Sequence, residues 1–216
     1  RHDAMKFRLS PRLALVIIAA MFILPLAVAW MMYSGAIENR PGTTRNLGQQ
    51  VQPPVPIAWE NDIEILSSDA MRSGADSDFS GLNGHWVILH TVEDPCQAGC
   101  ADAVTALRQV HRASGRNQNR IRLTLLLPDA EDRQLAGQLR EIYPSFDLVR
   151  PTPDEFLLTL EDIARSLSDS GAVYGNSYLV DPLGNIMMFY EAGSDPNDLK
   201  KDLKRLLTWS KLDEQS

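Results

Sequence analysis

Two cysteines four positions apart lie where an apolar strand passes into a helix. Cys96 and Cys100 are the only cysteines in this chain of 216 residues, and they closely follow the apolar run Trp86–Leu89. The segment that begins at Asp94 matches a capping box with proline at the first helical position. We therefore expect a helix with Asp94 as its N-cap and Cys96 at N2, directly after a buried strand. The position of the cysteines therefore predicts a fold in which a central strand leads directly into a helix.

The position of the cysteines also bears on their chemistry. At N2, unpaired backbone N–H groups and the helix dipole lower a thiol pKa, whereas the carboxylates of Glu93 and Asp94 raise it. Cys100 lies one turn further along, so the two thiols can form a disulfide or share a soft metal ion. A structural disulfide and two inert buried thiols are the alternatives. A bridge that closes a five-residue loop stabilises by only about 2 kcal/mol, which favours redox or metal chemistry.

The N-terminal part contains a long uncharged segment. Leu13–Tyr33 has no charged side chain, and three basic residues lie shortly before it. Such a run is long enough to cross a bilayer, and the positive-inside rule then places residues 1–12 in the cytoplasm and the remainder in the periplasm. A cleaved signal peptide is the alternative, because Ala27–Ala29 fits a cleavage site. The apolar run continues beyond that site, so we expect an uncleaved, single-pass anchor in a bacterial inner membrane.

Composition divides the remainder into a linker and one domain. Residues 34–58 are rich in proline, glycine and glutamine and are predicted to be a linker. Residues 59–213 are enough for one domain with a core. The net charge of the chain is −7. Residues 1–33 carry four positive side chains and one negative, so the remainder carries −10. This acidity argues against nucleic acid as a partner and is compatible with cationic partners or metal ions.

Strand and helix patterns alternate along the domain. Helical patterns follow Cys96, Asp129, Thr152 and Asp195, and the last two predicted strands are joined by a turn sequence that indicates a hairpin. Alternating units of this kind indicate a three-layer α/β sandwich. The predicted strands are Trp86–Val92, Ile121–Leu127, Asp147–Arg150, Ser177–Asp181 and Ile186–Glu191.

This order resembles the thioredoxin fold, and within it the Sco (SenC-like) group of membrane-anchored copper and thiol proteins. The C-x3-C spacing, the strand entry Leu82–Leu89 and the hairpin Tyr178–Asn185 carry the resemblance, over roughly residues 55–210. It implies a protein that assists cytochrome oxidase assembly as a thiol–disulfide reductant or a Cu(I) carrier. Cys96 would attack, Cys100 would resolve, and both would ligate the metal. The implied partners are the inner membrane and an oxidase subunit or another thiol or copper protein.

The chain departs from the Sco pattern at one ligand. That family binds copper with both cysteines and a histidine just before the hairpin strand, whereas Ser170–Ser177 contains no histidine. Two thiolates suit Cu(I), but Cu(II) also requires a nitrogen ligand. His90 is the candidate replacement, although a lone histidine on a strand is more often packed or hydrogen-bonded. The alternative function is therefore a non-catalytic assembly or docking factor that has lost copper binding.

Overall fold

The computed structural model consists of two compact units, residues 1–45 and 46–216. It describes residues 10–33, 46–67, 82–93, 96–127, 133–142, 144–152, 154–168 and 170–213. In the first unit, α1 spans Pro11–Tyr33 and includes the predicted anchor, residues 13–33. Within the described part of the chain, no helix meets the length and hydropathy criteria for crossing a membrane.

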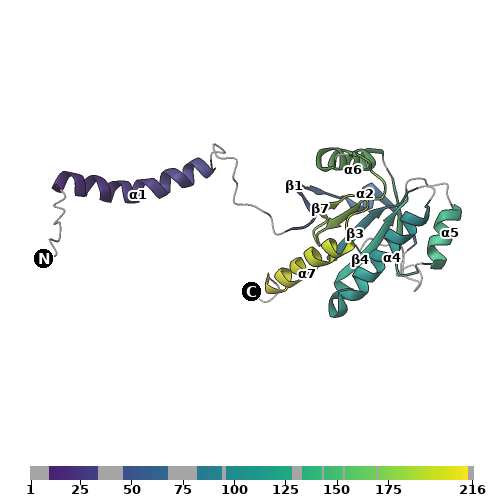
Figure 1. The fold of residues 1–216 in the computed structure, drawn as a ribbon. Helices are drawn as coiled ribbons and strands as arrows, with labels where there is room; N and C mark the ends of the chain where they lie inside the picture. Colours follow the sequence, from purple (N-terminus) through teal and green to yellow (C-terminus); the bar gives the residue numbers. More distant parts are fainter. Residues whose placement is uncertain are drawn as a thin grey trace. The chain divides into compact units, whose positions relative to one another are not determined.

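The second unit is built on a seven-stranded mixed sheet (Figure 1). The central strand β3 pairs in parallel with β4 and antiparallel with β6, and β6 continues through a hairpin into β7. The order across the sheet is β1-β7-β6-β3-β4-β5-β2, with β1 (Gln49–Pro56) and β2 (Ile63–Ser67) at its two edges. The five predicted strands are all present, as β3 (Trp86–Thr91), β4 (Ile121–Leu126), β5 (Asp147–Pro151), β6 (Ser177–Val180) and β7 (Asn185–Tyr190).

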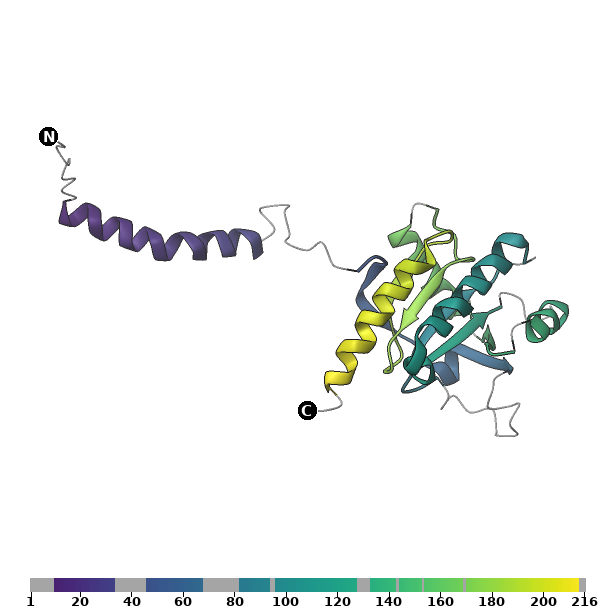
Figure 2. The ribbon, with the colours of Figure 1, turned by 60° about the horizontal axis from the view of Figure 1, so that its bottom comes forward.

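Helices cover both faces of this sheet. The helices α4 (Ala98–Ala113), α5 (Arg133–Ile142) and α7 (Pro196–Asp213) pack on one face, and α4 and α7 lie side by side in Figure 2. The helices α6 (Asp154–Leu167) and α2 (Trp59–Asp62) pack on the other. A short 3-10 helix, η2 (Gly115–Arg120), joins α4 to β4. The predicted three-layer α/β sandwich is therefore confirmed.

The central strand β3 is covered on both faces, and its sequence is largely apolar. Trp86 and Ile88 pack in the core beneath α4 and α7, whereas Val87 and Leu89 pack in the core beneath α6. All six residues of β3 are buried. Because successive side chains of a strand point to opposite faces, a strand covered on both sides must be apolar at every position that lacks a polar partner. His90 and Thr91 are the two polar exceptions, and both are hydrogen-bonded.

Both edge strands lie outside the strands predicted from the sequence. The strand β1 (Gln49–Pro56) pairs antiparallel with β7, and β2 (Ile63–Ser67) pairs antiparallel with β5. The predicted linker, residues 34–58, is therefore wrong in its C-terminal part, because the compact unit already begins at Asn46. The prolines in residues 34–58 had indicated a linker rather than a strand. An edge strand tolerates proline, and the pairing of β1 shifts register between Gln50 and Val55, where Pro53 and Pro54 lie.

Candidate redox site

The two cysteines lie at the carboxyl end of the central strand, at the start of α4. They are joined to each other by a disulfide, and their Cα atoms are 5.2 Å apart. Cys100 is 4% exposed and packs in the core with Val92 and Val104, whereas Cys96 is half-buried at the edge of that core. Cys96 is therefore more accessible to solvent than Cys100.

The predicted position of Cys96 within the helix is wrong. The first helical residue is Ala98 and the N-cap is Gln97, so Cys96 precedes the helix and Cys100 lies at N3. Gln97 has extended backbone angles, so the helical ladder cannot continue through it; the N–H of Ala101 donates to its carbonyl over 3.0 Å. The predicted cap, Asp94, lies outside the described residues. The favourable interaction with the N-terminal end of the helix dipole, which was predicted for Cys96, therefore applies to Cys100.

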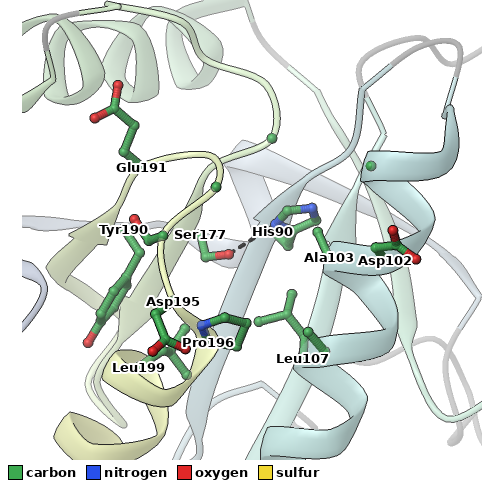
Figure 3. A pocket seen from close by; sticks show the side chains of 15 residues that line it. His90, Asp102, Ala103, Leu107, Ser177, Tyr190, Glu191, Asp195, Pro196 and Leu199 are labelled. Carbon is green, nitrogen blue, oxygen red and sulfur yellow. Dashed lines mark hydrogen bonds between the residues drawn. The ribbon is translucent and has the colours of Figure 1, made fainter.

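His90 lies on the same face of β3 as the core around Cys100. It is 1% exposed, and its Nδ1 lies 3.0 Å from Oγ of Ser177 on β6 (Figure 3). Its Nε2 is buried and has no hydrogen-bond partner among the described residues. Burial lowers the pKa of His90 to about 4, so the ring is neutral near pH 7. As expected for a lone histidine on a strand, His90 is packed and hydrogen-bonded.

The segment before β6, where the Sco pattern has its histidine, packs against the end of β3. The N–H of Gly175 donates to the Thr91 carbonyl over 2.7 Å, and the Thr91 hydroxyl donates to the Val173 carbonyl over 2.7 Å. Gly175 has φ +83°, and a Cβ placed there would lie 2.8 Å from Oε1 of Glu93. Because this φ lies in the left-handed region, any other residue at position 175 would strain the backbone. Among the described residues, no three His, Cys, Asp or Glu side chains are grouped to hold a metal ion.

A cavity of about 320 Å³ adjoins the disulfide-bearing helix (Figure 3). It lies between the N-terminal half of α4 and the start of α7, and His90 and Ser177 form part of its lining. Gly99, the neighbour of Cys100, lines it as well, although neither cysteine does. Sequence reasoning missed this cavity, because its walls come from four separate segments of the chain. Three carboxylate side chains also line it, namely Asp102, Glu191 and Asp195.

The comparison with known families agrees with the architecture. The family model described as "Transmembrane-like, thioredoxin-like, C-terminal domain" matches residues 86–210. The chain belongs to this family. The match covers the strand β3, the disulfide-bearing helix, the hairpin and most of α7, which are the elements that form the candidate site. The sequence matches none of the curated proteins.

Solved structures similar to the chain include Sco proteins from three organisms. Copper-bound Sco1 of yeast is 16% identical, with a TM-score of 0.49, over 76% of this chain and 94% of that chain. Copper-bound ScoI of Arabidopsis thaliana is 20% identical, with a TM-score of 0.44, over 59% and 87%. A SCO1/SenC family lipoprotein of Bacillus anthracis is 14% identical, with a TM-score of 0.47, over 73% and 99%.

Proposed function

We propose that this protein is a thiol–disulfide reductant in which Cys96 attacks the substrate and Cys100 resolves the intermediate. One observation carries the proposal: the two cysteines form a disulfide in which one partner is half-buried and the other is 4% exposed. Exchange requires an accessible sulfur that meets the substrate and a second sulfur held within reach of it. Cys96 and Cys100 meet these two requirements, respectively.

The proposed reaction transfers two electrons. The thiolate of reduced Cys96 attacks a disulfide of the substrate protein, which forms a mixed disulfide and releases one substrate thiolate. The thiolate of Cys100 then attacks the sulfur of Cys96, which closes the Cys96–Cys100 disulfide and releases the second substrate thiolate. The substrate is reduced to two thiols and the pair is oxidised. The disulfide in the structure corresponds to the product state, and an external dithiol must reduce it before the next cycle.

The direct test is equilibration of the full chain with glutathione or dithiothreitol redox buffers, followed by quantification of the free thiols. A substrate reductant requires a potential near or below that of its substrate. Cys96→Ser should abolish reduction of a model disulfide protein. Cys100→Ser should stop the reaction at the mixed disulfide, which is visible as a covalent adduct that added dithiothreitol releases. A Cys100→Ser variant that accumulates no adduct would contradict the proposed roles.

Carriage of Cu(I) as cargo is the second candidate function. Cys96 and Cys100 lie close enough to bond to each other, so after reduction they present two soft thiolates to one metal ion. We expect the reduced chain to bind one Cu(I) and to bind Cu(II) only weakly, because Ser170–Ser177 contains no histidine that could supply a nitrogen ligand. Titration with a Cu(I) chelator competitor measures the first affinity, and electron paramagnetic resonance detects nitrogen coordination of Cu(II).

The proposed location is the inner membrane, with the thioredoxin-like domain in the periplasm. This part rests on the sequence of residues 13–33 and on the basic residues before them. A reporter that is active only outside the cytoplasm, fused after Ser216, should be active. Recovery of a soluble periplasmic fragment that begins near Trp30 would show that the segment is cleaved.

The proposed cellular role is assistance to cytochrome oxidase assembly, and it follows from the Sco resemblance. Deletion of the gene should lower oxidase activity, most clearly when copper is scarce. A Cys96→Ser, Cys100→Ser double variant should not restore it. Full restoration by this variant would replace our proposal with the non-catalytic docking factor. An unchanged oxidase in the deletion strain would exclude both roles.

A further inference from the structure

The cavity beside the disulfide has two walls made of small residues. On α4, Gly99, Ala103 and Ala106 follow one another at the spacing of a single helix face. Opposite them, Gly193 and Pro196 lie where the chain enters α7. Together with Leu107 and Leu199, they give this cavity, which we call the slot, largely apolar walls. A volume of about 320 Å³ falls within the range of pockets that bind small ligands.

A polar atom in this slot lacks a partner among the described residues. Nδ1 of His90 faces Oγ of Ser177, and the Asn176 carbonyl also faces the ring, so we assign the ring proton to Nδ1. Nε2 then carries a lone pair that no donor uses. Figure 3 shows this nitrogen turned toward Ala103 of α4. A buried polar atom without a partner is energetically costly and rare in folded proteins. A group that enters the slot and donates a hydrogen bond to Nε2 removes this cost.

The charges around the slot restrict the ligand further. The lining that the structure describes includes the carboxylates of Asp102, Glu191 and Asp195 and contains no lysine or arginine. The hydrogen bond from the N–H of Asn197 lowers the pKa of Asp195, so this carboxylate stays ionised. The carboxylates of Asp102 and Asp195 belong to exposed residues, whereas His90 is buried. A ligand with a neutral donor at the floor and positive charge at the mouth complements this arrangement.

We propose that this slot binds an aromatic side chain that ends in a neutral donor, the indole of tryptophan or the phenol of tyrosine, flanked by basic residues in a partner polypeptide. Aromatic rings suit a slot with apolar walls, and the N–H or O–H at their edge would supply the donor that Nε2 of His90 lacks. Gly99 is adjacent to Cys100, so the bound segment lies beside the disulfide. The inference thus names a recognition subsite for the substrate of the proposed exchange, and it rests on that function.

The test uses the oxidised full chain in detergent, with histidine labelled with ¹⁵N. The probe is the blocked peptide Arg-Trp-Arg, and the matched controls are Arg-Phe-Arg, Glu-Trp-Glu and free indole. We expect Arg-Trp-Arg to shift the Nε2 resonance of His90 and to bind about tenfold more tightly than Arg-Phe-Arg, as one net hydrogen bond gives. Equal affinity for the tryptophan and phenylalanine peptides, or an unmoved Nε2 resonance, would overturn the proposal.

Three single variants and one variant without the cysteines complete the test. Ala106→Leu fills the slot and should abolish binding, whereas Ala98→Leu, at an exposed position of the same helix outside the slot, should leave it unchanged. His90→Phe should remove the preference for tryptophan. Free indole that binds as tightly as the peptide would assign the slot to a small molecule instead. The Cys96→Ser, Cys100→Ser variant, which cannot exchange disulfides, should still bind the peptide. In the wild type, exchange without peptide binding would refute the subsite, and peptide binding without exchange would refute only the proposed reductant.

Discussion

The hydroxyl of Tyr190 donates a hydrogen bond of 3.2 Å to Oδ2 of Asp202, and both residues are buried. The same carboxylate oxygen accepts hydrogen bonds from the backbone N–H groups of Leu47 and Gly48, over 2.7 and 2.9 Å. One buried charge thus joins β7, α7 and the start of the domain. Burial raises the pKa of the Tyr190 hydroxyl, and the negative charge of Asp202 raises it further.

Asp202→Ala should lower the free energy of unfolding by about 3 kcal/mol, because the buried hydroxyl of Tyr190 and two part-buried backbone N–H groups lose a charged acceptor. Urea denaturation followed by circular dichroism measures the change. Asp162→Ala is the control, since Asp162 forms an exposed ion pair with Arg165 that should contribute no more than about 0.5 kcal/mol. A loss for Asp202→Ala as small as that of the control would contradict the structural role of the network.

The buried His90 should make stability depend on pH. Its folded-state pKa is about 4, below the ordinary 6.5, because burial disfavours the charged ring. Between these values the unfolded state binds a proton that the folded state does not, so stability falls as pH decreases from 6.5 towards 4. The total loss should be about 3 kcal/mol. Unfolding free energies measured at intervals between pH 7 and 4 test this.

Two variants separate this effect from other titrating groups. His90→Phe should remove that part of the pH dependence, and His85→Ala should retain it, because His85 is only half-buried. An identical pH slope in the wild type and in His90→Phe would show that His90 does not titrate as the structure indicates.

Two glycine-to-alanine changes should have opposite effects. Gly184, in the β6–β7 turn, has φ +85°, and a Cβ there would lie 3.3 Å from the carbonyl oxygen of Ile57. Gly184→Ala should therefore destabilise the domain by about 1–3 kcal/mol. Gly137 lies inside α5, and a methyl group added there would meet no described atom within 4 Å, so Gly137→Ala should stabilise by up to about 1 kcal/mol. Thermal unfolding of both variants tests the pair; equal shifts would contradict the assignment.

Reduced Cys96 should react with iodoacetamide faster than reduced Cys100 at neutral pH. The reason is access, since Cys96 is half-buried and precedes the helix, whereas Cys100 is 4% exposed. Mass spectrometry of the alkylated peptides over time measures both rates. Cys100→Ser serves as the control and should retain the fast reaction. Slow and equal labelling of both thiols would favour a structural disulfide.

The sequence was sufficient for the parts of the fold that follow local rules. The strands β3 and β4 are largely apolar runs, and the turn sequence Asp181–Asn185 indicates the β6–β7 hairpin. The start of α7 was also predictable, because Asp195 precedes Pro196 and caps the helix through the N–H of Asn197. Each of these signals lies within a few residues of the structure it specifies.

The sequence was insufficient where a distant segment supplies the stabilising contact. The strand β1 forms despite its prolines because β7 offers an edge for pairing. Cys96 remains outside α4, although the capping pattern predicted it inside, and the extended backbone of Gln97 determines this. Capping propensity contributes only about 1 kcal/mol, so tertiary contacts can move a helix start by several residues.

The cysteine pair, its position after the central strand and the alternating order of elements were determined by the sequence, because each is a matter of local pattern and spacing. The slot around His90 was decided only by the tertiary structure. His90 and Ser177 are 87 positions apart, and Asp102 lies on α4 whereas Asp195 lies directly before α7. No local pattern brings such residues together. Their meeting depends on the pairing of β3 with β6 and on the packing of α4 beside α7.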